Sequence, residues 1–312
     1  MLTDVLALLG GLVLLVAGAS ALVRGASALA LRLGVSPLVV GLTVVAFGTS
    51  APELVVSVQA ALAGAGGIAV GNVVGSNIAN VGLILGIAVL VRPLATDPAL
   101  IRRDLPVLIV ATLLVGGLLL DDRIGAGEGV LLLAGLVAYL GWNVVTARRQ
   151  QGDADVLVEV PDGAVWRDLL FVTGGLVALV FGADLFVDAA VRLAESVGVS
   201  NAVIGLTVVA IGTSLPELAT TVIAAARGES EIAVGNVVGS NVFNLLGILG
   251  ASALVRPLEA PGLGASDVAV MAAFAVGLVG MLLTGRRLVR PEAAVLLLGY
   301  AVYVGYLASQ AA

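Results

Sequence analysis

Two glutamates, Glu53 and Glu217, lie inside long apolar segments, and each directly follows a proline. They end the segments GTSAPE (48–53) and GTSLPE (212–217). A carboxylate in such surroundings is costly unless it is paired, hydrated or bound to a cation. Proline and glycine both weaken a helix, so we expect it to unwind here and to free backbone carbonyls as ligands. Those carbonyls belong to Ala46, Thr49, Ala210 and Thr213.

Further oxygen-bearing side chains follow each glutamate at helical spacing. They stand at i, i+4 and i+8, as Asn72, Ser76 and Asn80 and as Asn236, Ser240 and Asn244. Each trio therefore shares one helix face, which we expect to meet the glutamates. The chain has no histidine and no cysteine, so the ligands would all be oxygen atoms. Hard cations, calcium and sodium above all, prefer such a set.

Each of these residues also has a purely structural interpretation. A lone serine or threonine often bonds a local carbonyl, and proline and glycine are common in membrane helices. Duplication of the whole combination favours binding, whereas Asn72 and Asn236 can equally brace an unwound helix. Asp184 and Asp188 have no acidic counterpart in the other copy. We expect them to line an access vestibule or to bond along their helix, and not to be central ligands.

The elements that carry these residues are membrane helices. The chain is 60% hydrophobic and only 12% charged, which is typical of a chain embedded in a bilayer. Ten apolar runs have the length of spanning helices and exclude a barrel. We interpret the first run as a span and not as a removed signal peptide. The runs cover 3–23 or beyond, 37–63, 67–91, 105–120, 127–146, 168–194, 201–226, 231–255, 266–284 and 291–309.

The sequence also matches itself at a shift of 164 positions. GLTVVAFGTSAPEL (41–54) pairs with GLTVVAIGTSLPEL (205–218), and IAVGNVVGSNIAN (68–80) pairs with IAVGNVVGSNVFN (232–244). Each copy has five runs, an odd number, so the copies must cross the membrane in opposite senses. We predict an all-α integral membrane protein with ten transmembrane helices in two inverted-topology five-helix repeats. The repeats are 1–147 and 168–312, joined by a polar cytoplasmic linker at 148–167.

The basic residues predict the orientation. All 15 are arginine, and the positive-inside rule places the face with most of them in the cytoplasm. That face would carry 12 arginines, leaving Arg123, Arg192 and Arg256 on the other. Both termini are then extracytoplasmic, in the inner (plasma) membrane. We expect no nucleic acid and no obligatory protein partner, and we find no nucleophile or metal constellation of an enzyme.

The GTSxPE and GNVxGSN elements, each present twice, resemble the alpha repeats of the calcium/cation antiporter superfamily. The likeness is to prokaryotic-type members of its sodium/calcium exchanger branch and extends over nearly all ten runs. It implies that Glu53 and Glu217 bind calcium with the carbonyls of Thr49 and Thr213. It also implies that Asn80 and Asn244 complete the middle of the cage, and that the first and sixth helices slide across the rest. The sodium sites would use Ala46, Ser50, Ser76, Ala210, Ser214 and Ser240.

Two features of the sequence bear on the coupling ion. Potassium-dependent relatives carry an aspartate at one of the positions that match Asn80 and Asn244, which speaks against potassium cotransport here. Proton-coupled relatives share an acidic, histidine-containing motif, and this chain has no histidine. We therefore expect exchange of Ca²⁺ for Na⁺, both as transported ions, with no cofactor. A proton-coupled antiporter of calcium or another divalent cation is the alternative, and a channel would conduct without counterflow.

Overall fold

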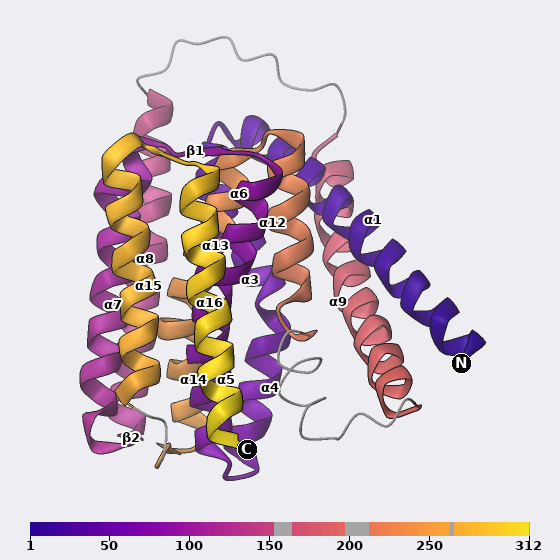
Figure 1. The fold of residues 1–312 in the computed structure, drawn as a ribbon. Coiled ribbons are helices and arrows are strands. Elements are labelled where there is room, and N and C mark those ends of the chain that lie inside the picture. Colours follow the sequence, from indigo (N-terminus) through magenta and orange to yellow (C-terminus); the bar gives the residue numbers. More distant parts are fainter. Residues whose placement is uncertain (153–163, 197–211, 262–264, 312) are drawn as a thin grey trace.

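The computed structural model describes residues 1–152, 164–196, 212–261 and 265–311, which form an all-helical bundle with two very short sheets (Figure 1). Among these residues, 8 helical segments are long and apolar enough to cross a membrane. The number becomes 9 when the bent pair Pro37–Thr49 and Ala51–Leu62 is counted as one span. The predicted helical membrane fold is confirmed. The predicted run 201–226 lies partly outside the described residues, so the count of ten stays a prediction.

The elements follow one another in a regular order. In the first half they are α1 (Leu2–Leu33), α2 (Pro37–Val40), η1 (Gly41–Val45), α3 (Ala46–Thr49), α4 (Ala51–Leu62), α5 (Gly66–Ala79), η2 (Asn80–Leu85), α6 (Gly86–Val91), β1 (Leu94–Ala95), η3 (Leu100–Asp104), α7 (Leu105–Leu118), η4 (Leu119–Asp121), β2 (Arg123–Ile124) and α8 (Ala126–Gly152). In the second half they are α9 (Val165–Ser196), α12 (Leu215–Arg227), α13 (Ser230–Val242), η6 (Phe243–Ile248), α14 (Leu249–Val255), β3 (Leu258–Glu259), α15 (Ala265–Gly285), β4 (Arg287–Leu288) and α16 (Arg290–Ala311). Here η marks π-helical turns, except for η4, which is a 3-10 turn.

Several helices begin at residues suited to a helix N-terminus. Pro52 and Pro216 stand in the first turns of α4 and α12, where a missing backbone donor costs little. Glu128 and Glu292 accept backbone N–H groups just before α8 and α16, at 2.5 and 2.8 Å. These acids also complement the positive end of the helix dipole. The four positions correspond in pairs across the shift of 164, so the same local chemistry starts the same helix in each half.

The two short sheets join the halves at opposite ends of the bundle. Strand β1 pairs with β4, with Leu94 opposite Leu288, and β2 pairs with β3, with Ile124 opposite Leu258. In Figure 1 the label β1 lies at the top of the molecule and β2 at the bottom. The shift of 164 relates β1 to β3 and β2 to β4, so each sheet contains one strand from each half. This crossed pairing is what two halves of opposite orientation produce.

Helices α1 and α9 lie side by side along one edge of the bundle (Figure 1). Ion pairs join Asp4 to Arg192, at 2.8 Å, and Arg32 to Asp168, so the start of each helix lies beside the end of the other. Glycines bring the two backbones into contact, because a Cβ added to Gly175 would lie 2.6 Å from the Leu22 nitrogen. The first helices of the two halves are therefore antiparallel and closely packed.

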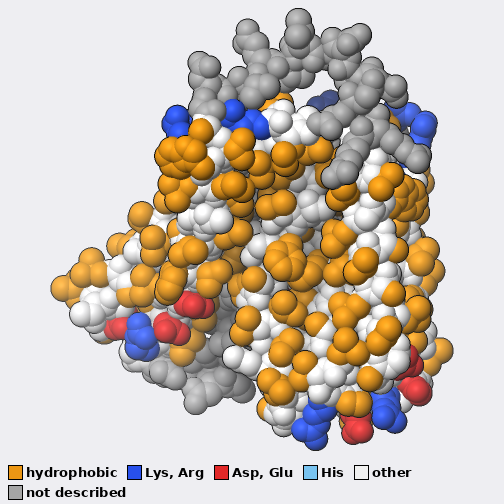
Figure 2. Space-filling model, turned by 180° about the vertical axis from the view of Figure 1, so that it is seen from behind, with side chains coloured by type: hydrophobic (Ala, Val, Ile, Leu, Met, Phe, Trp, Pro, Cys, Tyr) orange, Lys and Arg blue, Asp and Glu red, His pale blue; other side chains and the backbone are white. Residues whose placement is uncertain are grey.

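The spans that carry the oxygen-bearing side chains lie at the centre of the bundle. The apolar window of Ser230–Val255 is 100% buried within the protein, and that of Gly66–Val91 is 78% buried, against 17% for Arg290–Ser309. Lipid cannot satisfy the asparagines and serines of these two spans, so they require protein neighbours. The outer helices present leucine and valine to the bilayer instead, as the apolar surface in Figure 2 shows.

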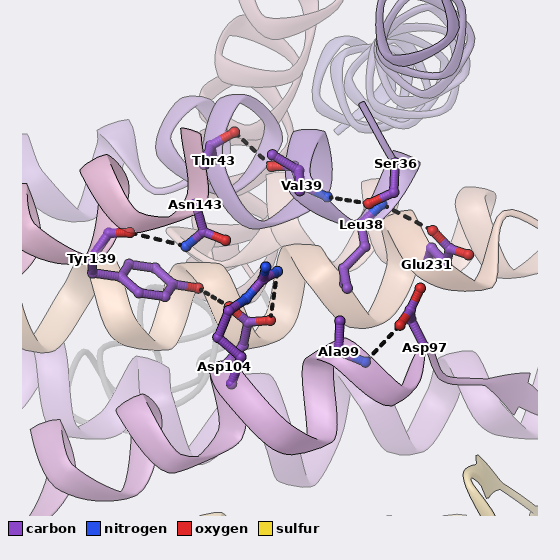
Figure 3. A network of polar contacts seen from close by, with 11 residues as sticks. Ser36, Leu38, Val39, Thr43, Asp97, Ala99, Asp104, Tyr139, Asn143 and Glu231 are labelled. Atoms are coloured by element: carbon purple, nitrogen blue, oxygen red, sulfur yellow. Dashed lines mark hydrogen bonds and ion pairs between the residues drawn. The ribbon is translucent and has the colours of Figure 1, made fainter. Parts of the chain in front are cut away.

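One predicted boundary is wrong. The run predicted at 105–120 belongs to a span that begins at Leu100, so Arg103 and Asp104 lie within it and are buried. Arg103 pairs with Asp104 at 3.3 Å, and Tyr139 of α8 donates to Asp104 at 3.2 Å (Figure 3). Because the charges satisfy one another, the helix can continue through them.

Candidate cation-binding site

Each glutamate lies in the first turn of a helix, shortly after a serine with non-helical dihedral angles. Between α3 and α4 the axis bends by 47° at Ser50, whose dihedral angles are φ −82° and ψ 8°. Ser214, just before α12, has nearly the same angles, φ −90° and ψ 8°. The break predicted from the proline and glycine pattern is present at Ser50, whereas residues 197–211, which lead to the second predicted break, lie outside the described residues. Both glutamates lie in the middle of the protein.

The two glutamates are buried and meet at the junction of the halves. Glu53 and Glu217 are each 1% exposed. Ser50 Oγ donates to Glu217 Oε1 at 2.8 Å, and Ser214 Oγ donates to Glu53 Oε1 at 3.2 Å. Each carboxylate is thus held by the serine of the other half. These two hydrogen bonds bring four of the predicted residues together in one site.

Several oxygen atoms of this site have no hydrogen-bond partner within the described part of the chain. They are Glu53 Oε2, Glu217 Oε2, Asn80 Oδ1, Asn244 Oδ1 and Ser240 Oγ, and all are buried. A buried acceptor without a partner costs about 1–3 kcal/mol, and an ionised one costs more. Since η2 packs against α12 and η6 against α4, Asn80 and Asn244 lie on elements beside the two glutamate helices. The donor set, carboxylate with amide and hydroxyl oxygens, suits a hard cation.

The remaining predicted residues are buried, half-buried or outside the described part of the chain. Thr49 is fully buried, and its hydroxyl lies 3.3 Å from the Ala46 carbonyl oxygen and 3.1 Å from Asn236 Oδ1. Ser76 and Ala46 are buried, whereas Thr213 is half-buried. Ala210 lies outside the described residues.

Asn72 and Asn236 brace the broken helices with their amide groups. Asn72 Nδ2 donates to the Glu53 carbonyl oxygen at 3.2 Å and to Ser57 Oγ at 2.9 Å. Asn236 Nδ2 donates to Thr221 Oγ1 at 3.0 Å. The bracing role that the sequence left open is therefore present for both residues.

Two asparagines that spacing did not select also contact the site. Asn77 and Asn241 are each 2% exposed and bond to Asn244 and Asn80, respectively. Both lie in the repeated GNVVGSN segment, and that repetition is the signal that could have identified them. Asp184 and Asp188, by contrast, are exposed on α9, and their role in a vestibule stays a prediction.

These features define a class of protein: a multi-span integral membrane protein with a buried cluster of unpartnered carboxylate, amide and hydroxyl oxygens at its centre. The family profile of the sodium/calcium exchanger protein matches residues 3–145 and 168–308. The chain therefore belongs to the sodium/calcium exchanger family, and it is a membrane antiporter of the calcium/cation antiporter superfamily. The resemblance inferred from the repeated motifs is confirmed.

Relatives match nearly the whole chain. The sodium/calcium exchanger MaX1 of Methanosarcina acetivorans is 36% identical, covering 96% of this chain and 97% of its own. The inner membrane protein YrbG of Escherichia coli is 39% identical, covering 93% and 91%. A solved structure of the sodium-calcium exchanger NCX_Mj, without Na⁺ and Ca²⁺, has a TM-score of 0.86 and 32% identity, and the match covers 97% of this chain and 98% of that one.

Proposed function

We propose that this protein exchanges Ca²⁺ for Na⁺ across the membrane by alternating access. The observation that carries the proposal is the set of unpartnered oxygens on Glu53, Glu217, Asn80 and Asn244, all buried at the junction of the halves. The names of MaX1 and NCX_Mj as sodium/calcium exchangers support the choice of ions. The proposed ligand set is Glu53, Glu217, Thr49, Thr213, Ser50, Ser214, Ala46, Ala210, Ser76, Ser240, Asn80 and Asn244.

Competition for one carboxylate pair explains the coupling. Occluding two negative charges without a cation is costly, because the carboxylates lose their hydration and no positive charge replaces it. A bound Ca²⁺, or Na⁺ in its place, offsets that cost, so the loaded protein can change its open side. Both ions need the same oxygens, so one must leave before the other binds. Halves of opposite orientation give the two open states similar energies.

We further propose that the protein lies in the inner membrane with both termini outside the cytoplasm. The name of the Escherichia coli relative supports the membrane, and the arginine distribution supports the orientation.

The test is uptake of radioactive calcium into proteoliposomes loaded with sodium, compared with potassium or choline loading. Glu53→Gln and Glu217→Gln should each abolish uptake, because each removes one of the two charges that bind Ca²⁺. Glu259→Gln is the matched control, since this acid is exposed on β3. Uptake driven only by a pH gradient would show proton coupling, and uptake without any counter-ion would show a channel.

A further inference from the structure

Four buried asparagines form a closed network between the halves. Asn77 Nδ2 donates to the backbone oxygen of Asn241, and Asn241 Nδ2 donates to that of Asn77, both at 3.3 Å. Asn80 Nδ2 donates to Asn241 Oδ1 at 2.9 Å, and Asn244 Nδ2 donates to Asn77 Oδ1 at 3.1 Å. All four side chains are at most 2% exposed. These four hydrogen bonds are the same from either half, and Asn77 Nδ2 also lies 3.9 Å from Met271 Sδ.

This network determines which end of an amide faces the cation site. The oxygen and the NH₂ group of an asparagine have nearly the same shape, so hydrogen-bond partners alone set the orientation. The amino groups of Asn80 and Asn244 are occupied, and their Oδ1 atoms are the ones left without a partner. With the amide turned over, two N–H donors would face the cation and repel it. A fixed orientation therefore preserves two ligands.

The orientation originates at the backbone. The backbone oxygens of Asn77 and Asn241 can only accept hydrogen bonds, so the side chain opposite each must present its NH₂ group. The Oδ1 atoms of Asn77 and Asn241 are then free to accept, and they can bond only the NH₂ groups of Asn244 and Asn80. Each of the two inner asparagines thus orients the site asparagine of the other half.

We propose that Asn77 and Asn241 are positioning residues, which hold the amide oxygens of Asn244 and Asn80 toward the transported cation. The proposal rests on the proposed function, because it assumes that these oxygens bind Ca²⁺. The amide groups of both inner asparagines are occupied by protein partners, so their proposed role is to orient the site asparagines and not to bind the cation. Each inner asparagine sets the orientation of one site amide only: Asn77 orients the Asn244 amide, and Asn241 orients the Asn80 amide.

A double-mutant cycle on purified protein tests this, with equilibrium binding of radioactive Ca²⁺ as the measurement. Asn77→Ala should weaken binding about tenfold, which corresponds to about 1.4 kcal/mol. In an Asn244→Asp background the same substitution should change binding less than about twofold, or about 0.4 kcal/mol. The reason is that a carboxylate presents an oxygen in either orientation.

The crossed pairing supplies the control. In an Asn80→Asp background, Asn77→Ala should keep its full effect, because Asn77 does not orient residue 80. If Asn77→Ala does not fold, as judged by size-exclusion chromatography, the mirror cycle of Asn241→Ala with Asn80→Asp takes its place. Equal effects of the inner substitution in all backgrounds, with binding to the unmodified protein intact, would overturn the inference alone. Absence of Ca²⁺ binding to the folded, unmodified protein would overturn the proposed function.

Discussion

Each glutamate of the site uses its two carboxylate oxygens differently. Oε1 accepts a serine hydroxyl from the opposite half, whereas Oε2 has no partner among the described residues. One oxygen therefore fixes the position of the carboxylate, and the other stays available for a cation. A charge-assisted hydrogen bond is strong enough to hold a side chain in place when the site is empty.

Protons should compete with calcium at these carboxylates. As pH falls, protonation removes the negative charge that attracts the cation, so binding weakens on the acidic side and recovers on the alkaline side. When the pH is lowered from about 8 to about 5, we expect the apparent KM for Ca²⁺ to rise several-fold. Saturating Ca²⁺ should restore the transport rate. Uptake into sodium-loaded vesicles at each pH measures this. A fall in the maximal rate with unchanged KM would place the proton effect elsewhere.

At the scale of residues the sequence predicted the helix break at Ser50, from a duplicated proline and glycine pattern. That the glutamates and serines bind a cation stays a prediction, and the serine–glutamate contacts between the halves were not predicted. Asn77 was missed because the spacing argument selected a single helix face, through Asn72, Ser76 and Asn80. Its partners lie in the other half, at Asn241 and Asn244, and no spacing within one helix reports such a contact.

Helices α1 and α9 pack closely against each other along their length. Asp4 and Asp168 occupy the same position in the two halves, and each pairs with an arginine near the end of the other helix. Glycines between these ends bring the backbones into contact. The two helices should therefore behave as one unit.

A single methyl group at this contact should be destabilising. Gly175→Ala would place Cβ 2.6 Å from the Leu22 nitrogen, whereas a Cβ at the neighbouring Gly174 meets nothing within 4 Å. We expect Gly175→Ala to cost about 1–3 kcal/mol through overpacking. Gly174→Ala should be neutral or slightly stabilising, because alanine favours a helix. Thermal unfolding in detergent compares the two, and equal melting temperatures would contradict a backbone contact.

Element boundaries were predicted less well than element positions. Apolar runs end at charged residues, so the span that contains α7 was expected to start after Asp104. The structure starts it at Leu100, because Arg103 pairs with Asp104 and Tyr139 donates a hydrogen bond to Asp104 inside the protein. Such mutual compensation depends on a second helix and cannot be seen in the run itself.

The distribution of charged side chains bears on the orientation in the membrane, which stays a prediction. On the face shown in Figure 2, the charged side chains that are coloured at the upper end are basic, whereas at the lower end basic and acidic side chains occur together. Proteins retain such arginine-rich ends on the cytoplasmic side. The same end carries β1 and the start of α9 (Figure 1).

Cysteine labelling can test this orientation, since the chain has no cysteine of its own. Ala95→Cys on β1 and Ser309→Cys near the end of α16 introduce single thiols at exposed positions on opposite sides. In intact cells a membrane-impermeant maleimide should label the variant at 309 and leave the variant at 95 unlabelled until the cells are permeabilised. The reverse pattern would invert the topology without affecting the proposed site.

The crossed strands suggest how such a molecule could have arisen. Because β3 is the counterpart of β1 and β4 of β2, the two sheets are a single contact made twice. Two identical copies of one half, inserted in opposite directions, could form both contacts without any change of register. Gene duplication and fusion of a dual-topology homodimer would then keep an interface that already existed. The linker would only join the two copies covalently.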